Sequence, residues 1–170
     1  MVNAAQDWHA ERAGMAGQTG MNDQVVSQRF HPPLDPFPGA LQAPTVRVER
    51  FAFGPEDLAT VRWRVFDWAS ALGLGSERTE HLVGAVNELT SNSVRHGGGR
   101  GELRMWCEER MLLLEVRDRG HISEPLQRRT RPAPGQPTGR GLWLADQLSD
   151  LLQIRSGPEG SIVRVHMLLA

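Results

Sequence analysis

Residues 87–99 read NELTSNSVRHGGG, and this stretch decides the fold. It carries Glu88, Asn92 and His96 at intervals of four residues and then ends in consecutive glycines. Side chains four residues apart follow one line along an α-helix. This line borders the apolar side of the helix and does not lie opposite it, so its polar groups need partners. The stretch therefore predicts a helix that packs on a sheet and holds a polar line at the edge of the packing surface.

The residues before this stretch extend the same helix toward the N-terminus. Ser76 is predicted to cap the helix, and the glycines at 97–99 end it. Its buried side is predicted at Leu82, Val86 and Leu89. Two explanations of the polar line stay open: the line makes structural hydrogen bonds along a partly exposed flank, or it faces a ligand.

Residues 45–74 predict a strand followed by another helix. TVRVERFAF at 45–53 alternates like a half-buried strand, and Pro55 marks a helix start. Trp63 and Phe66 lie off the core side of that helix, where they mark either a contact surface or ordinary exposed aromatics. The predicted core side consists of Leu58, Val61, Val65, Trp68, Ala69 and Leu72.

Downstream, the pattern predicts two hairpins and one more helix. Strands at 101–109 and 111–118 are separated by a short polar turn, as in a β-hairpin. A helix at 139–150 precedes a second hairpin, made of 151–156 and 161–169. Hairpin connections favour a mixed, mostly antiparallel sheet with the helices on one face. The predicted fold class is therefore α+β, a two-layer sandwich.

Residues 119–138, RGHISEPLQRRTRPAPGQPT, contain no periodic apolar run but several prolines and arginines. A loop of this length inside a domain is usually functional. The segment is predicted to be a lid over a site.

The composition narrows the class of protein. The 170 residues carry 19 arginines, no lysine and 20 acidic side chains, so the near-neutral charge argues against direct nucleic-acid binding. Cys107 is the single cysteine, and the sequence shows neither a signal-peptide pattern nor a membrane-spanning apolar run. We expect a cytoplasmic protein with no membrane association.

The domain organisation is predicted from a change in the sequence pattern near residue 45. Residues 1–44 are polar, contain glycines and then many prolines, and show no sustained apolar period, which predicts a disordered N-terminal tail. Residues 45–170 are predicted to form one domain.

Two further motifs sit at the ends of predicted elements. Asp118 and Gly120 end an apolar strand, which sets a carboxylate acceptor beside backbone that a flat ligand can approach, as an adenine amine requires. Gly139 and Gly141 open a helix, where exposed amide hydrogens suit an anion such as phosphate. Each motif alone is weak. Their order after the polar helix line is much more specific.

Three segments together resemble a known family: ELTSNSVRHG at 88–97, RDRGHI at 117–122 and GRGLWLADQL at 139–148. They are similar in order and spacing to the N, G1 and G2 boxes of the histidine-kinase-type (GHKL) ATPase superfamily, and in particular to stand-alone bacterial anti-sigma-factor serine kinases. The resemblance covers residues 46–169. It implies the Bergerat fold, with the long loop as the ATP lid.

The resemblance implies ATP and Mg²⁺ as cofactors and gives roles to single residues. Asn92 would bind the magnesium ion that bridges the nucleotide phosphates, and Glu88 would act as the base or orienting group for the attacking hydroxyl. Asp118 would accept a hydrogen bond from the adenine amino group, while Gly120 allows close approach to the base. The remaining nucleotide-binding candidates are Gly139 and Gly141 through their amides, Arg95, His96 and Arg140 near the phosphates, Leu142 in the same helix start, and Ser161 near the base.

By this resemblance, the expected function is that of a protein serine kinase that uses ATP, phosphorylates an anti-anti-sigma-type protein and sequesters a sigma factor. The alternative is a nucleotide-binding interaction module without significant transfer. Ile122 supports the alternative because the G1 box commonly has glycine there, and Glu88 argues against it. Separately, Trp106 and Leu113 on the outer face of the sheet would form an apolar patch suited to a homodimer.

Overall fold

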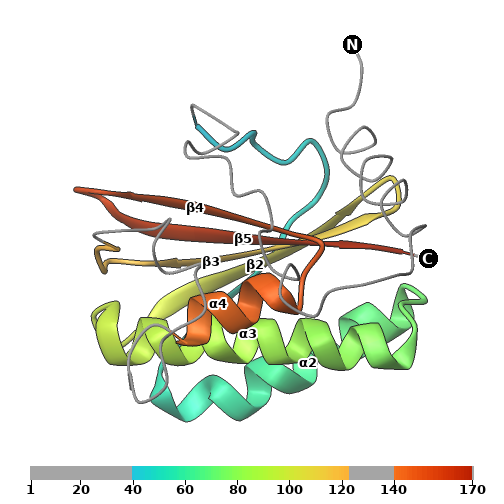
Figure 1. Cartoon of the computed structure of the whole chain (residues 1–170), viewed down its shortest axis with the longest axis horizontal. Helices are drawn as coiled ribbons and strands as arrows, with labels where there is room; N and C mark the ends of the chain where they lie inside the picture. The colour runs from blue at the N-terminus through green and yellow to red at the C-terminus, as the bar shows by residue number, and fades with distance from the viewer. Residues whose placement is uncertain (1–39, 123–139, 170) are drawn as a thin grey trace, which may run out of the picture. The chain divides into compact units, whose positions relative to one another are not determined.

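The structure is a computed structural model that describes residues 40–122 and 140–169 (Figure 1). The chain divides into two units, Met1–Phe37 and Pro38–Ala170, and every described element belongs to the second. Residues 1–39 of the expected tail lie outside the described residues. The elements are β1 (Glu49–Phe53), the 3₁₀ turn η1 (Pro55–Asp57), α2 (Leu58–Ala71), α3 (Ser76–His96), β2 (Gly101–Glu108), β3 (Met111–Asp118), α4 (Arg140–Gln147), β4 (Leu151–Gly157) and β5 (Gly160–Leu168).

The described strands form one open sheet, in the order β1-β2-β3-β5-β4, and the helices cover one of its faces (Figure 1). The predicted α+β two-layer fold is confirmed. Every neighbouring pair of described strands is antiparallel, so the sheet is more uniform than the mixed sheet that we expected. In residues 40–122 and 140–169, no helix combines the length and the apolar character needed to cross a membrane.

The first strand is shorter than predicted. β1 begins at Glu49, which pairs with Met105 of β2, so residues 45–48 are not part of the sheet. The backbone N–H of Thr45 instead donates to the Glu108 carboxylate at 2.9 Å. At Thr45, the Glu108 side chain accepts the backbone hydrogen bond that a neighbouring strand would otherwise accept. The carbonyl of Gln42, which precedes Thr45 in the chain, accepts a hydrogen bond from Arg164 of β5. The domain boundary that the sequence predicts after residue 44 stays a prediction.

α2 follows the predicted apolar side except at its C-terminal end. Val61, Val65 and Ala69 are fully buried, whereas Leu72 is 39% exposed. The prediction for Leu72 was wrong because this residue is the C-cap of the helix. Gly73 adopts a left-handed φ of 85°, and the next residue turns back to donate its N–H to the Ala69 carbonyl at 3.1 Å. This Schellman closure buries Leu74 in place of Leu72.

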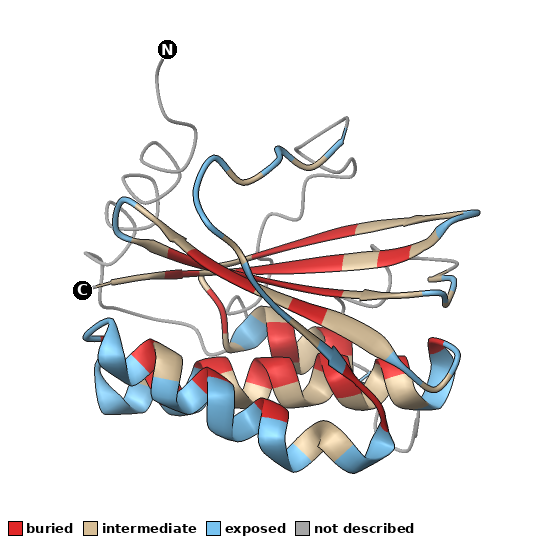
Figure 2. Cartoon of the chain, turned by 180° about the vertical axis from the view of Figure 1, so that it is seen from behind, coloured by how far each residue is buried: buried red, intermediate tan, exposed pale blue. Residues whose placement is uncertain are grey.

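α3 is the central helix of the layer and packs by the predicted apolar side. Leu82, Val86 and Leu89 are all at most 2% exposed. Its N-cap residue is Gly75, and no side-chain cap is formed, so the predicted capping role of Ser76 was wrong. Figure 2 shows the burial directly, with buried residues on the sides of the helices that face the sheet and exposed residues on the opposite sides.

The inner face of the sheet supplies the other half of the core. Leu103, Leu114 and Val165 come from three neighbouring strands and are fully buried under the helices. Alternate residues of the same strands point to the opposite, outer face. The helical layer and the sheet therefore share a single core.

The outer face does not carry the exposed apolar patch that we expected. Trp106 and Leu113 do lie opposite each other there, but they are only 2% and 6% exposed. Next to them, Glu115 is fully buried and accepts hydrogen bonds from Arg164 at 2.7 Å and from Arg117 at 2.8 Å. Both oxygens of the Glu115 carboxylate are therefore paired, Oε1 with Arg164 and Oε2 with Arg117. An exposed dimer patch at these two residues is ruled out.

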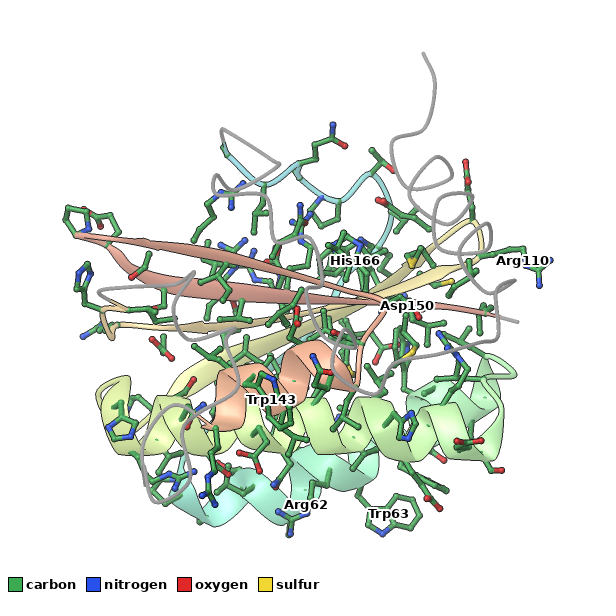
Figure 3. The ribbon with its side chains drawn as sticks, viewed as in Figure 1. Arg62, Trp63, Arg110, Trp143, Asp150 and His166 are labelled. Atoms are coloured by element: carbon green, nitrogen blue, oxygen red, sulfur yellow. The ribbon has the colours of Figure 1, made fainter. Side chains whose placement is uncertain are left out.

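His166 lies on the same outer face of β5 (Figure 3). Its ring nitrogen is 2.9 Å from the Gln153 side-chain oxygen. Burial lowers the pKa of His166 to about 4, and the positive charge of Arg164 adds to the shift, against smaller opposing effects of Glu115 and Asp150. The imidazole is therefore neutral in the folded protein at neutral pH.

The stability of the fold should fall as the pH falls from about 6.5 toward 4. The folded pKa lies below the ordinary value of 6.5, so the unfolded chain takes up the proton first, and the loss reaches at most about 3 kcal/mol from this one group. Urea unfolding at several pH values measures the slope. His166→Gln keeps a donor for Gln153 but does not titrate, and an unchanged slope in this variant would contradict the assignment.

Candidate functional site

The polar line of α3 meets the start of α4. A Cβ atom on Gly141 would lie 2.6 Å from the Asn92 amide nitrogen and 3.0 Å from a Glu88 carboxylate oxygen. Only glycine allows the α4 backbone to come this close to both side chains without displacing them. Glu88 and Asn92 are each half-buried, so they border the core and remain accessible from one side. The first turn of α4 and the middle of α3 therefore form one polar cluster.

Asp118 lies at the other end of the site, where β3 ends. Its Oδ2 atom accepts a hydrogen bond from the Ser93 hydroxyl at 2.5 Å, and its Oδ1 atom accepts one from the Gly120 N–H at 2.8 Å. A carboxylate has about four acceptor positions, so two such bonds fix its orientation and leave further acceptor capacity. The carboxylate is thereby held in one orientation at the end of α3.

Two glycines allow this end of the helix to approach the strand. A Cβ atom on Gly97 would lie 2.6 Å from Asp118 Oδ2, and one on Gly120 would lie 2.8 Å from the Gly97 Cα. The Gly97 carbonyl also accepts a hydrogen bond from the Arg119 N–H at 3.2 Å. Gly97 therefore serves the contact with the G1 segment as well as the end of α3.

β5 closes the same corner. The Ser161 hydroxyl donates to the Gly120 carbonyl at 2.8 Å, and Ser161 pairs with Asp118 across the strands. Gly160 has a left-handed φ of 123°, and a Cβ atom there would lie 2.1 Å from the Asp118 carbonyl oxygen. Ser161 thus reaches the G1 segment through Gly120.

The root of the predicted lid is tied to β4. The Ile122 N–H donates to the Ser156 hydroxyl at 2.8 Å, and the same hydroxyl lies 3.3 Å from the His121 ring. The Ile122 side chain packs against the hydrophobic core. Residues 123–139, which include most of the predicted lid and Gly139, lie outside the described residues.

The other predicted residues lie at the borders of this site. Arg95 and His96 are exposed in the last turn of α3, and the Arg95 guanidinium donates to the Ser91 carbonyl at 3.1 Å. Arg140 is exposed at the start of α4, whereas Leu142 is 7% exposed and belongs to the core. Leu142 packs in the hydrophobic core beside the polar cluster, and its predicted part in nucleotide binding stays a prediction.

Sequence reasoning missed Ser93 and Gly97. Ser93 is 1% exposed and sits one turn after Leu89 on the buried side of α3, where a polar residue needs a partner. The polar Ser93 among apolar residues on this side of α3 was the signal in the sequence that could have identified it. Gly97 was read only as a helix end, because its contact with Asp118 joins residues from separate elements.

Comparison with known proteins identifies the class. The sequence model of the histidine kinase-like ATPase domain matches residues 51–167. The chain belongs to this family, and ATP is the nucleotide that an ATPase domain implies. No curated protein is similar enough to this chain to count as a match.

Two solved structures are similar to this chain. The crystal structure of the RsbU and RsbW domains of Rv1364c from Mycobacterium tuberculosis is 19% identical, with a TM-score of 0.55 over 73% of this chain. This chain spans only 33% of that structure's length. The histidine kinase AdeS of Acinetobacter baumannii is 15% identical, with a TM-score of 0.44, covering 73% of this chain and 69% of that one. At 19% identity, the likeness to the Mycobacterium tuberculosis structure concerns the fold alone.

The described residues fit ATP and a magnesium ion by their chemistry. Asp118 offers an oriented acceptor at a glycine-lined corner, and the bare backbone of Gly141 lies against Asn92. No group of three His, Cys, Asp or Glu side chains in the described part of the chain is arranged to hold a metal ion. A magnesium ion here would therefore take most of its ligands from phosphates and water, which is its usual preference.

Gly141→Ala should weaken ATP binding by about tenfold or more, because the added methyl group displaces the Asn92 and Glu88 side chains, a loss of about 1.4 kcal/mol. Isothermal titration calorimetry with ATP measures the affinity. Gly157→Ala is the matched control, since a Cβ atom at Gly157 meets nothing within 4 Å. Equal affinity in the two variants would show that the close approach of α4 is unimportant for the nucleotide.

Proposed function

We propose that this chain is an ATP-dependent protein serine kinase that phosphorylates an anti-anti-sigma-type protein and sequesters a sigma factor. The observation that carries the proposal is the approach of Gly141 to both Glu88 and Asn92, with Asp118 held at the end of the same helix. Along α3, Glu88 would act as the base and Asn92 as the magnesium ligand, and Ser93 would support Asp118 as the adenine acceptor.

The nucleotide would lie along α3 between two ends of the site. The adenine amino group would donate to the remaining acceptor capacity of Asp118, with Ser93 holding the carboxylate in place. The phosphates would lie at the start of α4, where backbone N–H groups point outward and the helix dipole favours negative charge. Arg95, His96 and Arg140 stand exposed at the borders and are candidates for further phosphate contacts.

A magnesium ion, when bound with ATP, would neutralise charge on the phosphates. Asn92 is the proposed protein ligand through its side-chain oxygen, because oxygen is the donor that magnesium prefers. The close approach of Gly141 restricts the orientation of this carboxamide, so the ligand would be preorganised.

Glu88 would serve the transfer itself. The serine oxygen of the partner forms a bond to the γ-phosphorus while the bond from that phosphorus to the bridging oxygen breaks, and ADP leaves. Glu88 would accept the proton of the serine hydroxyl, as a positioned carboxylate does in general base catalysis. Phosphoryl transfer depends mainly on position and charge neutralisation, so one carboxylate beside the phosphates is sufficient.

The alternative function is an interaction module in which ATP is a conformational ligand without significant transfer. Ile122 favours this alternative, because its backbone is tied to Ser156 and its side chain packs on the core. Glycine in this position would give the lid root more freedom. The difference between the two functions therefore lies in turnover and not in nucleotide binding.

The partners are proposed from the family resemblance. RsbW names one of the domains in the Mycobacterium tuberculosis structure, which is similar to this chain in fold. The division into a tail at 1–44 and a domain at 45–170, together with a cytoplasmic location, belongs to the same proposal.

Calorimetry with ATP, with and without magnesium, should separate the roles of three residues. Asp118→Asn is expected to lose most ATP affinity, because the amide presents a donor to the adenine amine, and Asn92→Ala to lose the magnesium-dependent part. Glu88→Gln should bind ATP like the unaltered protein. Circular dichroism checks that each variant folds, and full ATP affinity in Asp118→Asn would overturn the proposed adenine position.

Transfer of labelled phosphate to purified anti-anti-sigma-type proteins of the source organism tests the kinase function. The unaltered protein should label a serine, and Glu88→Gln should lower the rate by about 10²- to 10⁴-fold, the usual contribution of a general base. Intact ATP binding without any transfer would favour the interaction module.

A further inference from the structure

Ser93 is a polar residue on the buried side of α3, and the helix itself does not require it. Its side chain is 1% exposed and lies one turn after Leu89. Alanine would fill such a position at lower cost, because serine has the lower helix propensity and brings a hydroxyl that needs a partner. The reason for the hydroxyl therefore lies outside the helix.

The Ser93 hydroxyl has two acceptors, and the closer one belongs to the candidate site. Its oxygen lies 3.2 Å from the Leu89 carbonyl oxygen and 2.5 Å from Asp118 Oδ2. A serine hydroxyl carries one proton, and a carboxylate is the stronger acceptor. The proton is therefore directed to Asp118.

Thr90 provides a contrast on the same helix. It is also 1% exposed, but among the described residues its hydroxyl bonds only to the carbonyls of Val86 and Asn87, at 2.9 and 3.3 Å. Ser93 and Thr90 thus carry equally buried hydroxyls, and only that of Ser93 reaches the adenine acceptor.

The bond from Ser93 makes the two oxygens of Asp118 unequal. Oδ2 accepts the Ser93 hydroxyl, and a Cβ atom on Gly97 would lie 2.6 Å from it, so this oxygen lies against the end of α3. Within the described part of the chain, Oδ1 accepts one hydrogen bond, from the Gly120 N–H at 2.8 Å. Oδ1 therefore keeps the acceptor capacity that a ligand can use.

Adenine and guanine make different demands on such a carboxylate. Adenine offers its 6-amino group as a donor, and a single oxygen accepts it, whereas guanine has the acceptor O6 at the same position. Guanine pairs well with a carboxylate through its N1–H and 2-amino groups together, which needs both oxygens at once, as in other bidentate pairs. A carboxylate with one oxygen already engaged by the protein therefore suits adenine.

We propose that Ser93 is a positioning residue that makes the nucleotide site selective for adenine over guanine. Its hydroxyl holds Oδ2 of Asp118 against α3, so that only Oδ1 is presented to the base. This inference rests on the proposed adenine position at Asp118 and adds the origin of the base selectivity.

Isothermal titration calorimetry of the full chain with ATP, GTP and inosine triphosphate tests this selectivity. The unaltered protein should bind ATP most tightly. Ser93→Ala should lower the preference for ATP over GTP by about tenfold or more, the factor that a hydrogen bond to a charged group supplies. Inosine triphosphate has the O6 and N1–H of GTP but lacks the 2-amino group. The preference for ATP over inosine triphosphate should therefore change less.

Thr90→Val is the matched control, because it removes a buried hydroxyl from the same helix with little change of shape and should keep the unaltered preference. Circular dichroism verifies folding. An equal loss of ATP and GTP affinity in Ser93→Ala would reveal a merely structural role and overturn the proposal, as would the same change of preference in Thr90→Val. Equal gains for GTP and inosine triphosphate would overturn the paired contact.

Asp118→Asn separates this inference from the proposed function. Loss of ATP affinity in Asp118→Asn, with an unchanged preference in Ser93→Ala, overturns the role of Ser93 alone. Full ATP affinity in Asp118→Asn, or an unaltered protein that binds none of the three nucleotides, overturns the adenine position and the selectivity together.

Discussion

The packing of α3 against β3 is the constraint on which the rest of the structure depends. The apolar side of α3 covers the centre of the sheet, and its last turns bring Ser93 and Gly97 into contact with Asp118 at the end of β3. Because both contacts lie on one rigid helix, the burial of leucine and valine upstream fixes where the polar residues stand. The packing of α3 on the sheet therefore forms the core and also positions the residues of the candidate site.

Glycine supplies the second requirement, which is close approach. Gly97, Gly120 and Gly141 each leave too little space for a Cβ atom beside a polar group of the site. At these three positions the missing side chain brings backbone within reach of a carboxylate, a helix end or a carboxamide. The N, G1 and G2 segments therefore meet through their glycines, although they are far apart in the sequence. Binding of a nucleotide by such a corner relies on backbone groups as much as on side chains.

Three surfaces of the domain carry different groups of side chains. The α4 side of α3 holds the polar cluster around Asn92, the outer face of the sheet holds the buried ion pairs of Glu115, and α2 carries the exposed Trp63.

Most of the fold was determined by the sequence itself, because the apolar periods of α3, β2, β3 and β5 and the turns between them are local patterns. The line of Glu88 and Asn92 and the acceptor at Asp118 were likewise readable from spacing and from the family resemblance. Tertiary structure alone decided the partners of these groups: Ser93 bonded to Asp118, Gly141 placed on Asn92, and Trp106 buried on the outer face. It also decided where β1 begins and why Leu72 is exposed. Such outcomes depend on contacts between distant segments and on side chains competing for the same backbone groups, which no local pattern encodes.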